Sequence, residues 1–408
     1  GLGRASCVAW PPVLLPSARP VLFLGVSALL PGALVLSGCT SSPKTVVSPT
    51  RTTSVAPPTA AVVTPPPFTA TGMPAALAAV IKPLYFGGAV PSSPSATLLL
   101  RKRTPVKPTA KVVVKGAVSS WKGVPIAVVT SGKDVTLAVK APNWKVVGGW
   151  WPSVGLSRPS LGSTPRRVLL VGSDARPGQA IDGSRGDSLH IVGLDGHGGG
   201  GILGIARDSY VSLATGGMGK INSALMFGGP KALQRTVVSA TGVPLEGYMI
   251  TGFTGFKTLI NGIGGLRLKA PVAVRDTKSS ANVKAGVNQL SGVQALSYAR
   301  ARHAVAGGDF GRSANQGLLV KALADFARLA GPARLPGILH MADPKIATNL
   351  SAEQVLTFAA GAYVVPSNRI HNRVAAGSFG WTADRQSIVL FDAQARRYFA
   401  DIRDGNLS

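Results

Sequence analysis

Carboxylates and arginines recur together at the ends of three apolar runs in the part of the chain that follows residue 165. Asp174 follows residues 167–172 (RVLLVG), Arg185 and Asp187 precede the next run, and Arg207 ends the third. Because ligands bind at the carboxyl ends of strands in open α/β sheets, we expect these side chains to form one site. Guanidinium groups suit bidentate recognition of phosphate, and carboxylates suit Mg²⁺.

Two predicted helices contribute further groups of the same kind. The segment ALSYARARH ends one helix with Arg300 and Arg302, and DFGRSANQ begins the next with Arg312 and Gln316. A metal ion surrounded by arginines is suited to phosphoryl transfer, which depends mostly on positioning and charge neutralisation. Surface salt bridges are the alternative interpretation of any single pair of these charges.

No other catalytic signature of similar strength occurs in the sequence. The five histidines lack the HExxH or Cys/His spacing of a zinc site, and the two cysteines cannot form a disulfide framework. The glycines at 198–201 lack the Lys-Ser/Thr of a P-loop and are predicted to form a hairpin turn. Ser173 does not stand in a GxSxG elbow.

The elements that position these residues alternate between extended and helical patterns. Helical spacing is clearest where Leu319, Leu323 and Phe326 recur at i, i+4 and i+7. The alternation indicates an α/β or α-β-α layered fold. The predicted strands are 167–172, 188–194, 201–206, 245–251 and 266–274, and the predicted helices are 230–241, 255–263, 291–302 and 312–330.

The formal net charge of +27 suggests an anionic partner. Residues 1–133 hold 13 Lys/Arg and no Asp or Glu, and the remaining residues hold 30 Lys/Arg against all 16 acids. There is no Lys/Arg-rich arm, zinc-finger spacing or basic stripe interleaved with aromatics, so nucleic acid is not predicted as a partner. Two explanations of the charge remain open. One is a compositional bias against Asp and Glu, and the other is binding to phosphate, pyrophosphate or lipid head groups.

An apolar run near the amino terminus predicts export. Residues 21–36 (VLFLGVSALLPGALVL) are short for a bilayer span, which needs about 20 residues. The run leads into Leu36-Ser37-Gly38-Cys39, which resembles the lipobox of bacterial lipoproteins, in which the cysteine thiol carries a diacylglycerol. An ordinary transmembrane anchor is the alternative. Either way, residues 1–39 are predicted to hold the protein at the extracytoplasmic face of the cell membrane, lipid- or helix-anchored.

Composition changes divide the rest of the chain into three parts. Residues 40–71 are rich in Ser, Thr, Pro and Val and are predicted to form an extended linker. Residues 72–163 contain short β runs punctuated by Gly and Pro, which predict a small β-rich accessory module without chemistry of its own. The charged clusters all fall in residues 164–405, which we predict to be the catalytic domain.

The charged segments also carry a resemblance. LLVGSDAR, RGDSL, IARDSYV, KINSALMFGGP, ALSYARARH and DFGRSANQ occur in the order and spacing of the LytR-CpsA-Psr family, over about residues 165–330, and the remainder resembles the family's actinobacterial tail. The resemblance implies an α-β-α layered domain with a mixed central sheet. It also implies a membrane-anchored enzyme that moves a glycopolymer from a polyprenyl-pyrophosphate carrier to peptidoglycan, as a phosphodiester on the muramic acid 6-hydroxyl.

The same resemblance implies roles for individual residues. Asp174 and Asp187 would hold Mg²⁺, or Mn²⁺ in its place, or orient the attacking hydroxyl, and together with Arg207 and Arg302 they would be catalytic. The pyrophosphate would be bound by Arg185, Arg207, Lys220, Arg300, Arg302, Arg312 and Gln316, with a structural role as the alternative for Lys220. Apolar faces of helices at 225–238, 253–263 and 318–326 would line a tunnel for the prenyl chain, with ordinary core as the alternative.

Two positions depart from the family pattern. Gly186 stands where Ser or Thr is usual, and Ala206 stands where Pro is common, but neither change removes a charged group. The functional expectation is a Mg²⁺-dependent glycopolymer phosphotransferase. Its rivals are a hydrolase acting on the same lipid carrier with water as acceptor, and a non-catalytic polyprenyl-lipid binding protein.

Overall fold

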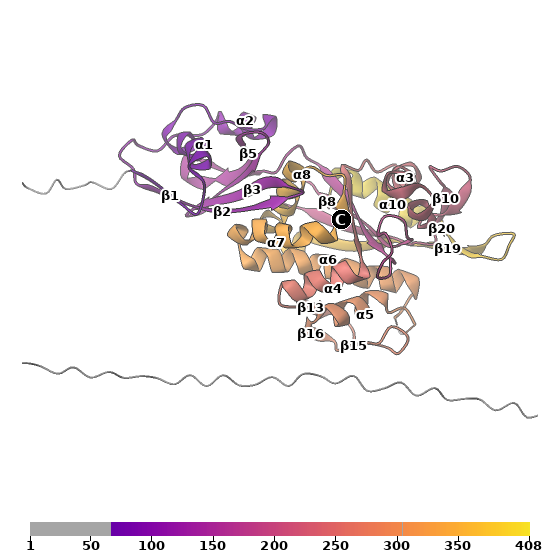
Figure 1. Ribbon diagram of the computed structural model, residues 1–408. Helices are drawn as coiled ribbons and strands as arrows, with labels where there is room; N and C mark the ends of the chain where they lie inside the picture. Colours follow the sequence, from indigo (N-terminus) through magenta and orange to yellow (C-terminus); the bar gives the residue numbers. More distant parts are fainter. Residues whose placement is uncertain (1–66, 304) are drawn as a thin grey trace, which may run out of the picture. The chain divides into compact units, whose positions relative to one another are not determined.

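The computed structural model describes residues 67–303 and 305–408, and these form one compact unit (Figure 1). The predicted anchor at 1–39, including Cys39, and most of the predicted linker lie outside the described residues. The linker prediction extends too far, because its last residues, Phe68–Thr71, form strand β1. Within the described residues, no helix has the length and apolar character needed to cross a membrane.

An accessory module, residues 68–160, is built on a six-stranded sheet in the order β1-β2-β3-β4-β5-β6. Helices α1 (Ala75–Phe86) and α2 (Pro94–Leu100), which the sequence analysis did not predict, pack on one face of this sheet around Trp151. The remaining strands of this sheet are β2 (Val112–Trp121), β3 (Val124–Ser131), β4 (Asp134–Lys140), β5 (Trp144–Trp151) and β6 (Leu156–Ser160).

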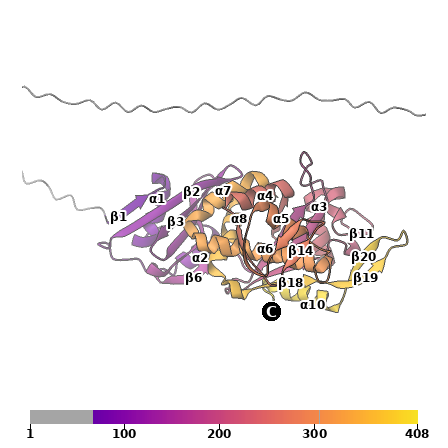
Figure 2. The same cartoon turned by 90° about the horizontal axis from the view of Figure 1, so that it is seen from below.

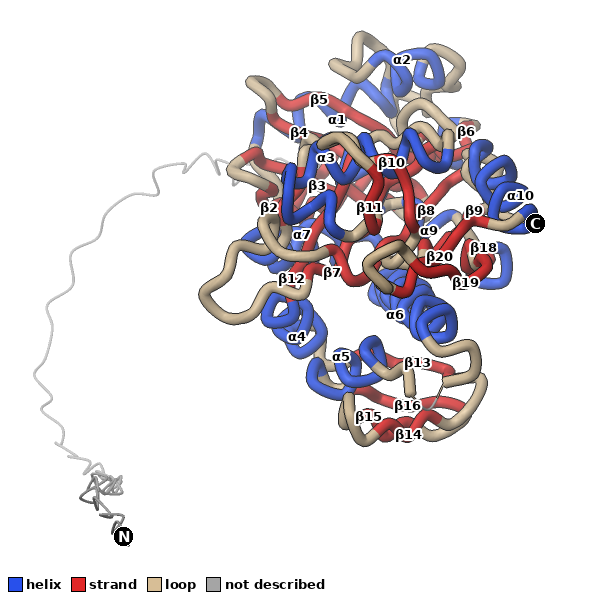
Figure 3. Tube along the Cα trace, turned by 90° about the vertical axis from the view of Figure 1, so that its right-hand side faces the viewer, coloured by secondary structure: helices blue, strands red, loops and turns tan. Residues whose placement is uncertain are grey.

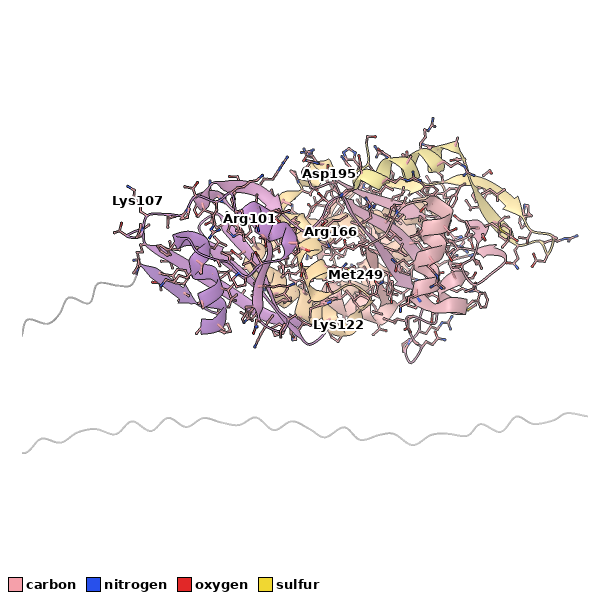
Figure 4. All side chains as sticks on the ribbon, turned by 90° about the horizontal axis from the view of Figure 1, so that it is seen from above. Arg101, Lys107, Lys122, Arg166, Asp195 and Met249 are labelled. Carbon is pink, nitrogen blue, oxygen red and sulfur yellow. The ribbon has the colours of Figure 1, made fainter. Side chains whose placement is uncertain are left out.

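The other face of the module packs against the rest of the protein. Trp121 and Leu137 from the module share a buried apolar cluster with Leu335 and Leu356. Lys122 adds polar contacts at this junction: its backbone N–H donates to Asp343 Oδ2 (2.8 Å), and its Nζ lies 2.8 Å from Oδ1 of the same carboxylate (Figure 4). The module is therefore part of the packed structure rather than a domain on a tether.

A second six-stranded sheet, the main sheet, has the order β17-β12-β7-β8-β9-β18. Strand β7 is parallel to β12 and antiparallel to β8, and β9 is antiparallel to β8 and parallel to β18. The sheet is mixed, and the α/β fold class is confirmed. Its strands are β7 (Arg166–Ser173), β8 (Gly186–Leu194), β9 (Gly200–Ile205), β12 (Gly247–Gly252), β17 (Ala347–Thr348) and β18 (Ile370–Ala375).

Helices cover both faces of the main sheet because its strands alternate apolar side chains between the two sides. Leu169 and Val171 of β7 pack with α3 (Ser223–Thr241) and α10 (Ala393–Asp401), whereas Val168 and Leu170 face the opposite layer. That opposite layer contains α6 (Asp309–Ala330), α7 (Leu335–Ala342), α8 (Ala352–Ala359) and α9 (Gly361–Val364) (Figure 2).

A smaller lobe lies against α6 and consists of two helices and two two-stranded antiparallel sheets (Figure 3). Its parts are α4 (Phe253–Gly262), α5 (Gly292–Arg300), the pair β13 (Leu266–Ala270) with β16 (Gly286–Leu290), and the pair β14 (Val274–Asp276) with β15 (Ala281–Val283). Helix α5 begins with a capping box: Ser291 Oγ accepts from Gln294 N–H, and Gln294 Oε1 accepts from Ser291 N–H. Helix α5 packs against α6, and this contact places its last residue, Arg300, beside α6.

Two hairpins complete the described chain near the carboxyl end of β9. They are β10 (Tyr210–Ser212) with β11 (Met218–Lys220), and β19 (Gly377–Trp381) with β20 (Ser387–Phe391). The strands and helices of residues 167–330 that carry clear periodicity occur near their predicted positions. No elements were predicted after residue 330, where α7 to α10 and β17 to β20 occur.

Candidate active site

A cavity of about 720 Å³ lies between the main sheet and the helices of the α6 layer. Most of it is lined by apolar side chains, among them Met249 from β12, which Figure 4 labels, Leu259 from α4 and Leu339 from α7. Helix α6 contributes Leu319 and Leu323. Two of the three helices predicted to line a tunnel, 253–263 and 318–326, therefore contribute side chains to this cavity. The first prediction, 225–238, is wrong, because α3 packs on the opposite face of the sheet.

The cavity has a charged end at one edge of the main sheet. The lining residues there include six basic side chains and three carboxylates. We define the charged end as Asp174, Arg176, Asp187, Arg207, Asp276, Lys278, Arg300, Arg302, Arg312 and Gln316. Seven of the nine predicted site residues belong to it, and the other two, Arg185 and Lys220, do not line the cavity.

Strand direction explains why residues from three strands meet there. Asp174 follows the end of β7, Asp187 stands at the start of β8, and Arg207 follows the end of β9. Because β8 is antiparallel to both neighbours, its first residues lie beside the last residues of β7 and β9. Arg207 Nη1 donates to Asp187 Oδ2 at 2.7 Å.

The first turn of α6 extends this ion pair into a network. Arg207 Nε lies 3.9 Å from Asp309 Oδ2, and Arg312 Nη2 lies 2.8 Å from Asp309 Oδ1. Asp309 is the first residue of α6, where the helix dipole favours a negative charge. Burial alone lowers the pKa of Arg207, but attraction from Asp187 and Asp309 outweighs it and holds that pKa above its ordinary value.

The guanidinium groups of Arg207 and Arg312 are buried, and each has an N–H donor available to a ligand. Within residues 67–303 and 305–408, Nε of Arg207 and Nε of Arg312 are buried and have no hydrogen-bond partner. Burial also lowers the pKa of Arg312, an effect to which the neighbouring cations Arg207 and Arg302 add. An unpaired buried donor on a cation is costly, so this arrangement favours an anion at the charged end.

The Arg300–His303 segment belongs to the smaller lobe and reaches the charged end of the cavity. The Arg300 guanidinium lies over the Phe253 ring, 5.2 Å from its centroid, and Gln316 Nε2 donates to the carbonyl of Ala299 at 2.9 Å. These contacts place Arg300 with its charge at the cavity and leave Arg302 exposed beside it.

Asp276 organises this segment and was missed by the sequence analysis. Its Oδ2 accepts from the backbone N–H groups of Arg302 (2.9 Å) and His303 (3.0 Å), and its Oδ1 accepts from Lys278 (2.9 Å) and Ser279 (3.4 Å). The bond from His303, with those from the other three amides, lowers the pKa of Asp276. The only sequence signal was an acid in an Asp-x-Lys-Ser turn, a pattern that indicates local turn bonding and not a distant partner.

The two predicted residues outside the cavity have other surroundings. The side chain of Arg185 is exposed, and it is the backbone N–H of this residue that donates to Asp174 Oδ1 at 2.9 Å. Lys220 Nζ lies 3.1 Å from Asp208 Oδ1, on the β10–β11 hairpin side. Sharing a short motif with Asp187 therefore did not place the Arg185 side chain at the cavity, and the motif of Lys220 contributes no lining residue.

A divalent cation fits the carboxylates of the charged end. Asp187 Oδ1 is buried and, within the described part of the chain, has no hydrogen-bond partner, while Asp174 lines the same end. No group of three or more His, Cys, Asp or Glu suited to a metal occurs among the described residues. Mg²⁺ characteristically uses one or two carboxylates and completes its shell with water and substrate phosphate, so two carboxylates suffice.

His190 lies on β8 in the wall of the cavity and is fully buried. Its Nε2 is 3.0 Å from the carbonyl oxygen of Ser313, and its Nδ1 is 3.2 Å from Ser188 Oγ. Burial lowers the pKa of His190 to about 4. The imidazole is therefore neutral near pH 7, and the carbonyl partner assigns its proton to Nε2, which gives His190 a structural role in the wall.

Comparisons with known proteins identify the family of the chain. A model of the LytR_cpsA_psr family matches residues 154–398. The probable cell wall biosynthesis protein LcpB of Corynebacterium glutamicum is 32% identical over 183 residues, which cover 42% of each chain. The polyisoprenyl-teichoic acid–peptidoglycan teichoic acid transferase TagV of Bacillus subtilis is 34% identical over 199 residues, 46% of this chain and 50% of TagV.

The crystal structure of B. subtilis TagV also resembles the fold. It superposes with a TM-score of 0.51 at 28% identity, covering 60% of this chain and all of the TagV chain in that structure. Against the curated sequences, however, the match spans about half the length of TagV and less than half of LcpB.

Proposed function

Because the chain belongs to the LytR_cpsA_psr family, we propose that it is a cell-wall transferase that moves a glycopolymer from a polyprenyl-pyrophosphate carrier onto peptidoglycan. The names of its relatives support this class of reaction, since TagV is named a teichoic acid transferase and LcpB a cell wall biosynthesis protein. We further propose that the protein acts at the extracytoplasmic face of the membrane, held there by residues 1–39.

The observation that carries the proposal is a cavity with two chemically different parts. Six basic side chains gather at one end, and the remainder is lined mostly by Leu, Ile, Val, Met and Phe side chains. A polyprenyl pyrophosphate has the same division, with a charged head and a long hydrocarbon tail. Burial of the tail would hold the head against Arg207, Arg300, Arg302 and Arg312, so that binding energy from the tail positions the reacting phosphate.

In the proposed reaction, an acceptor hydroxyl attacks the phosphorus atom that carries the glycopolymer. A new P–O bond forms, the bond from this phosphorus to the bridging oxygen breaks, and polyprenyl phosphate leaves with the electron pair. The arginines stabilise the charge that develops on the leaving phosphate. The hydroxyl proton passes to a carboxylate of the charged end, for which Asp187 Oδ1 and Asp174 are the candidates.

Asp174 and Asp187 are also the residues that would hold Mg²⁺ or Mn²⁺. When bound, such an ion supplies neutralisation of phosphate charge. Arg207 would also orient the Asp187 carboxylate, because it donates to Oδ2 and leaves Oδ1 without a hydrogen-bond partner among the described residues. Asp309 in turn links Arg207 to Arg312, so the two guanidinium groups are placed by one carboxylate.

The test is transfer by the purified protein from a synthetic polyprenyl-pyrophosphate glycan to peptidoglycan fragments. We expect Arg302→Ala and Asp187→Ala each to lower transfer by at least about a hundredfold. Arg235→Ala, an exposed arginine on α3 outside the main cavity, is the matched control and should retain wild-type transfer. Release of free glycan phosphate without acceptor would identify a hydrolase, and tight lipid binding without turnover would identify a lipid-binding protein.

A further inference from the structure

Two large aromatic side chains are exposed on one face of the β19–β20 hairpin. Phe379 is 67% exposed and Trp381 is 72% exposed. They are two residues apart on β19, so they point to the same side of the strand, with their Cα atoms roughly 7 Å apart. Figures 1 and 2 show this hairpin projecting from the end of the main sheet. We call these two rings the aromatic platform.

The platform is joined to the charged end of the cavity. The Phe379 ring packs on Phe310 with ring centroids 5.4 Å apart, and Phe310 stands in the first turn of α6 beside Asp309. On the second strand, Val389 N–H donates to the carbonyl of Asp208, the residue after Arg207, at 3.0 Å. The hairpin is thus held by the same two segments that supply the Asp309–Arg207 contact.

The platform has the chemistry of a sugar-binding surface. Neither strand of the hairpin contains a charged residue (GSFGW and SIVLF), and Ser387, which pairs with Trp381 across the two strands, supplies a hydroxyl group on the face of the rings. A pyranose ring presents a flat face of C–H groups that packs on an aromatic ring, while its rim of hydroxyls needs polar partners. Exposed apolar patches rimmed by polar groups mark binding sites on soluble domains.

We propose that the aromatic platform binds the glycan strand of the peptidoglycan acceptor and so brings an acceptor hydroxyl to the charged end. This proposal rests on the proposed function, which requires an acceptor at that place. A neutral amino-sugar strand suits the uncharged face better than a phosphate-rich donor polymer does. The turn of the hairpin carries one acid and one base, Asp384 and Arg385, so its tip adds no net positive charge that would attract an anionic membrane surface.

The experiment measures binding of a β-1,4-linked N-acetylglucosamine tetrasaccharide to the full-length protein by calorimetry, without any lipid donor. We expect the Phe379→Ala/Trp381→Ala double variant and Trp381→Ala alone to weaken binding by at least about tenfold. Trp381→Phe keeps an aromatic ring and should bind within about twofold of wild type. Leu390→Ala removes an exposed apolar side chain (44% exposed) from the other face of the same hairpin and is the matched control.

Several outcomes would overturn the proposal. These are a wild-type protein that shows no saturable binding of the tetrasaccharide, a double variant that binds like wild type, and a Leu390→Ala variant that loses as much affinity as the double variant. Loss of sedimentation with anionic phospholipid vesicles, with unchanged tetrasaccharide binding, would assign the rings to the membrane instead. Concentration-dependent dimerisation lost in the double variant, again with unchanged tetrasaccharide binding, would assign them to a second copy.

Failure of this proposal is distinguishable from failure of the proposed function. The double variant should still bind a polyprenyl pyrophosphate with wild-type affinity, because neither ring lines the cavity. Arg302→Ala should bind the tetrasaccharide normally while losing transfer. If the wild-type protein bound the tetrasaccharide through the rings but showed no transfer, the proposed reaction would be contradicted. The proposed glycan site would not.

Discussion

Asp276 Oδ2 accepts a hydrogen bond from the backbone N–H of Arg302 at 2.9 Å, across a separation of 26 residues. The same oxygen accepts from His303, and the carboxylate is almost fully buried, at 3% exposure. The pair joins the β14–β15 hairpin to the end of α5. The direction in which the chain carries Arg302 away from α5 therefore depends on the Asp276 carboxylate.

Replacing Asp276 with Asn should lower transfer by about tenfold or more, because the new amide group brings two donors to a site lined with backbone N–H donors. In an Arg302→Ala background, Asp276→Asn should lower transfer little further, since the guanidinium that Asp276 positions is already absent. A transfer assay on the two single variants and the double variant measures this coupling. Additive losses would show that Asp276 acts independently of Arg302. Asp325→Asn, an acid paired with Arg328 on α6, is the control.

Protonation of His190 should make stability depend on pH. Its pKa is about 4 in the folded protein and 6.5 ordinarily, so the unfolded chain binds more protons between these values. The stabilising contribution is fully present above pH 6.5 and is lost as the pH falls toward 4, by roughly 3 kcal/mol at most. Thermal unfolding from pH 7.5 to 4.5 measures the decline, and His190→Gln should flatten it. An equal decline in that variant would assign the effect to other groups.

Removing Asp187 should weaken metal binding as well as transfer. We expect Asp187→Ala to lower Mn²⁺ affinity by about tenfold or more in the presence of a pyrophosphate analogue, because one of two carboxylate ligands is lost. Electron paramagnetic resonance of Mn²⁺ gives this affinity without reference to turnover. EDTA should abolish wild-type transfer, and added Mg²⁺ should restore it. Unchanged Mn²⁺ affinity in the variant would separate Asp187 from the metal.

Narrowing the apolar part of the cavity should discriminate against long lipid chains. Leu323→Trp adds bulk to a lining position on α6, so the KM for a long-chain donor should rise by about tenfold while a short-chain donor is unaffected. Leu329→Trp makes the same change at a position of α6 that is 75% exposed, and it should leave both donors unaffected. Equal effects of Leu323→Trp on both donors would place the lipid chain elsewhere.

Much of the main domain could be predicted from the sequence because its elements follow local rules. Buried strands such as β9 are continuous apolar runs, and α6 shows a helical period in Leu319, Leu323 and Phe326. Helices α1 and α2 escaped prediction because each carries or begins with proline, at Pro83 and Pro94. Their helical state depends on packing against the module sheet, which a local pattern does not contain.

The sequence by itself determined most of the groups that line the charged end, since arginines and carboxylates stand in short motifs at predicted strand and helix ends. Only the tertiary structure decided which of them meet. Strand order and direction bring Asp187, Arg207 and Asp309 together, although they come from two strand ends and a helix start. Arg185 shares a motif with Asp187, yet it lies in the loop before β8, where its side chain is exposed and does not line the cavity. Such convergence depends on contacts between residues far apart in the chain, and no local spacing encodes them.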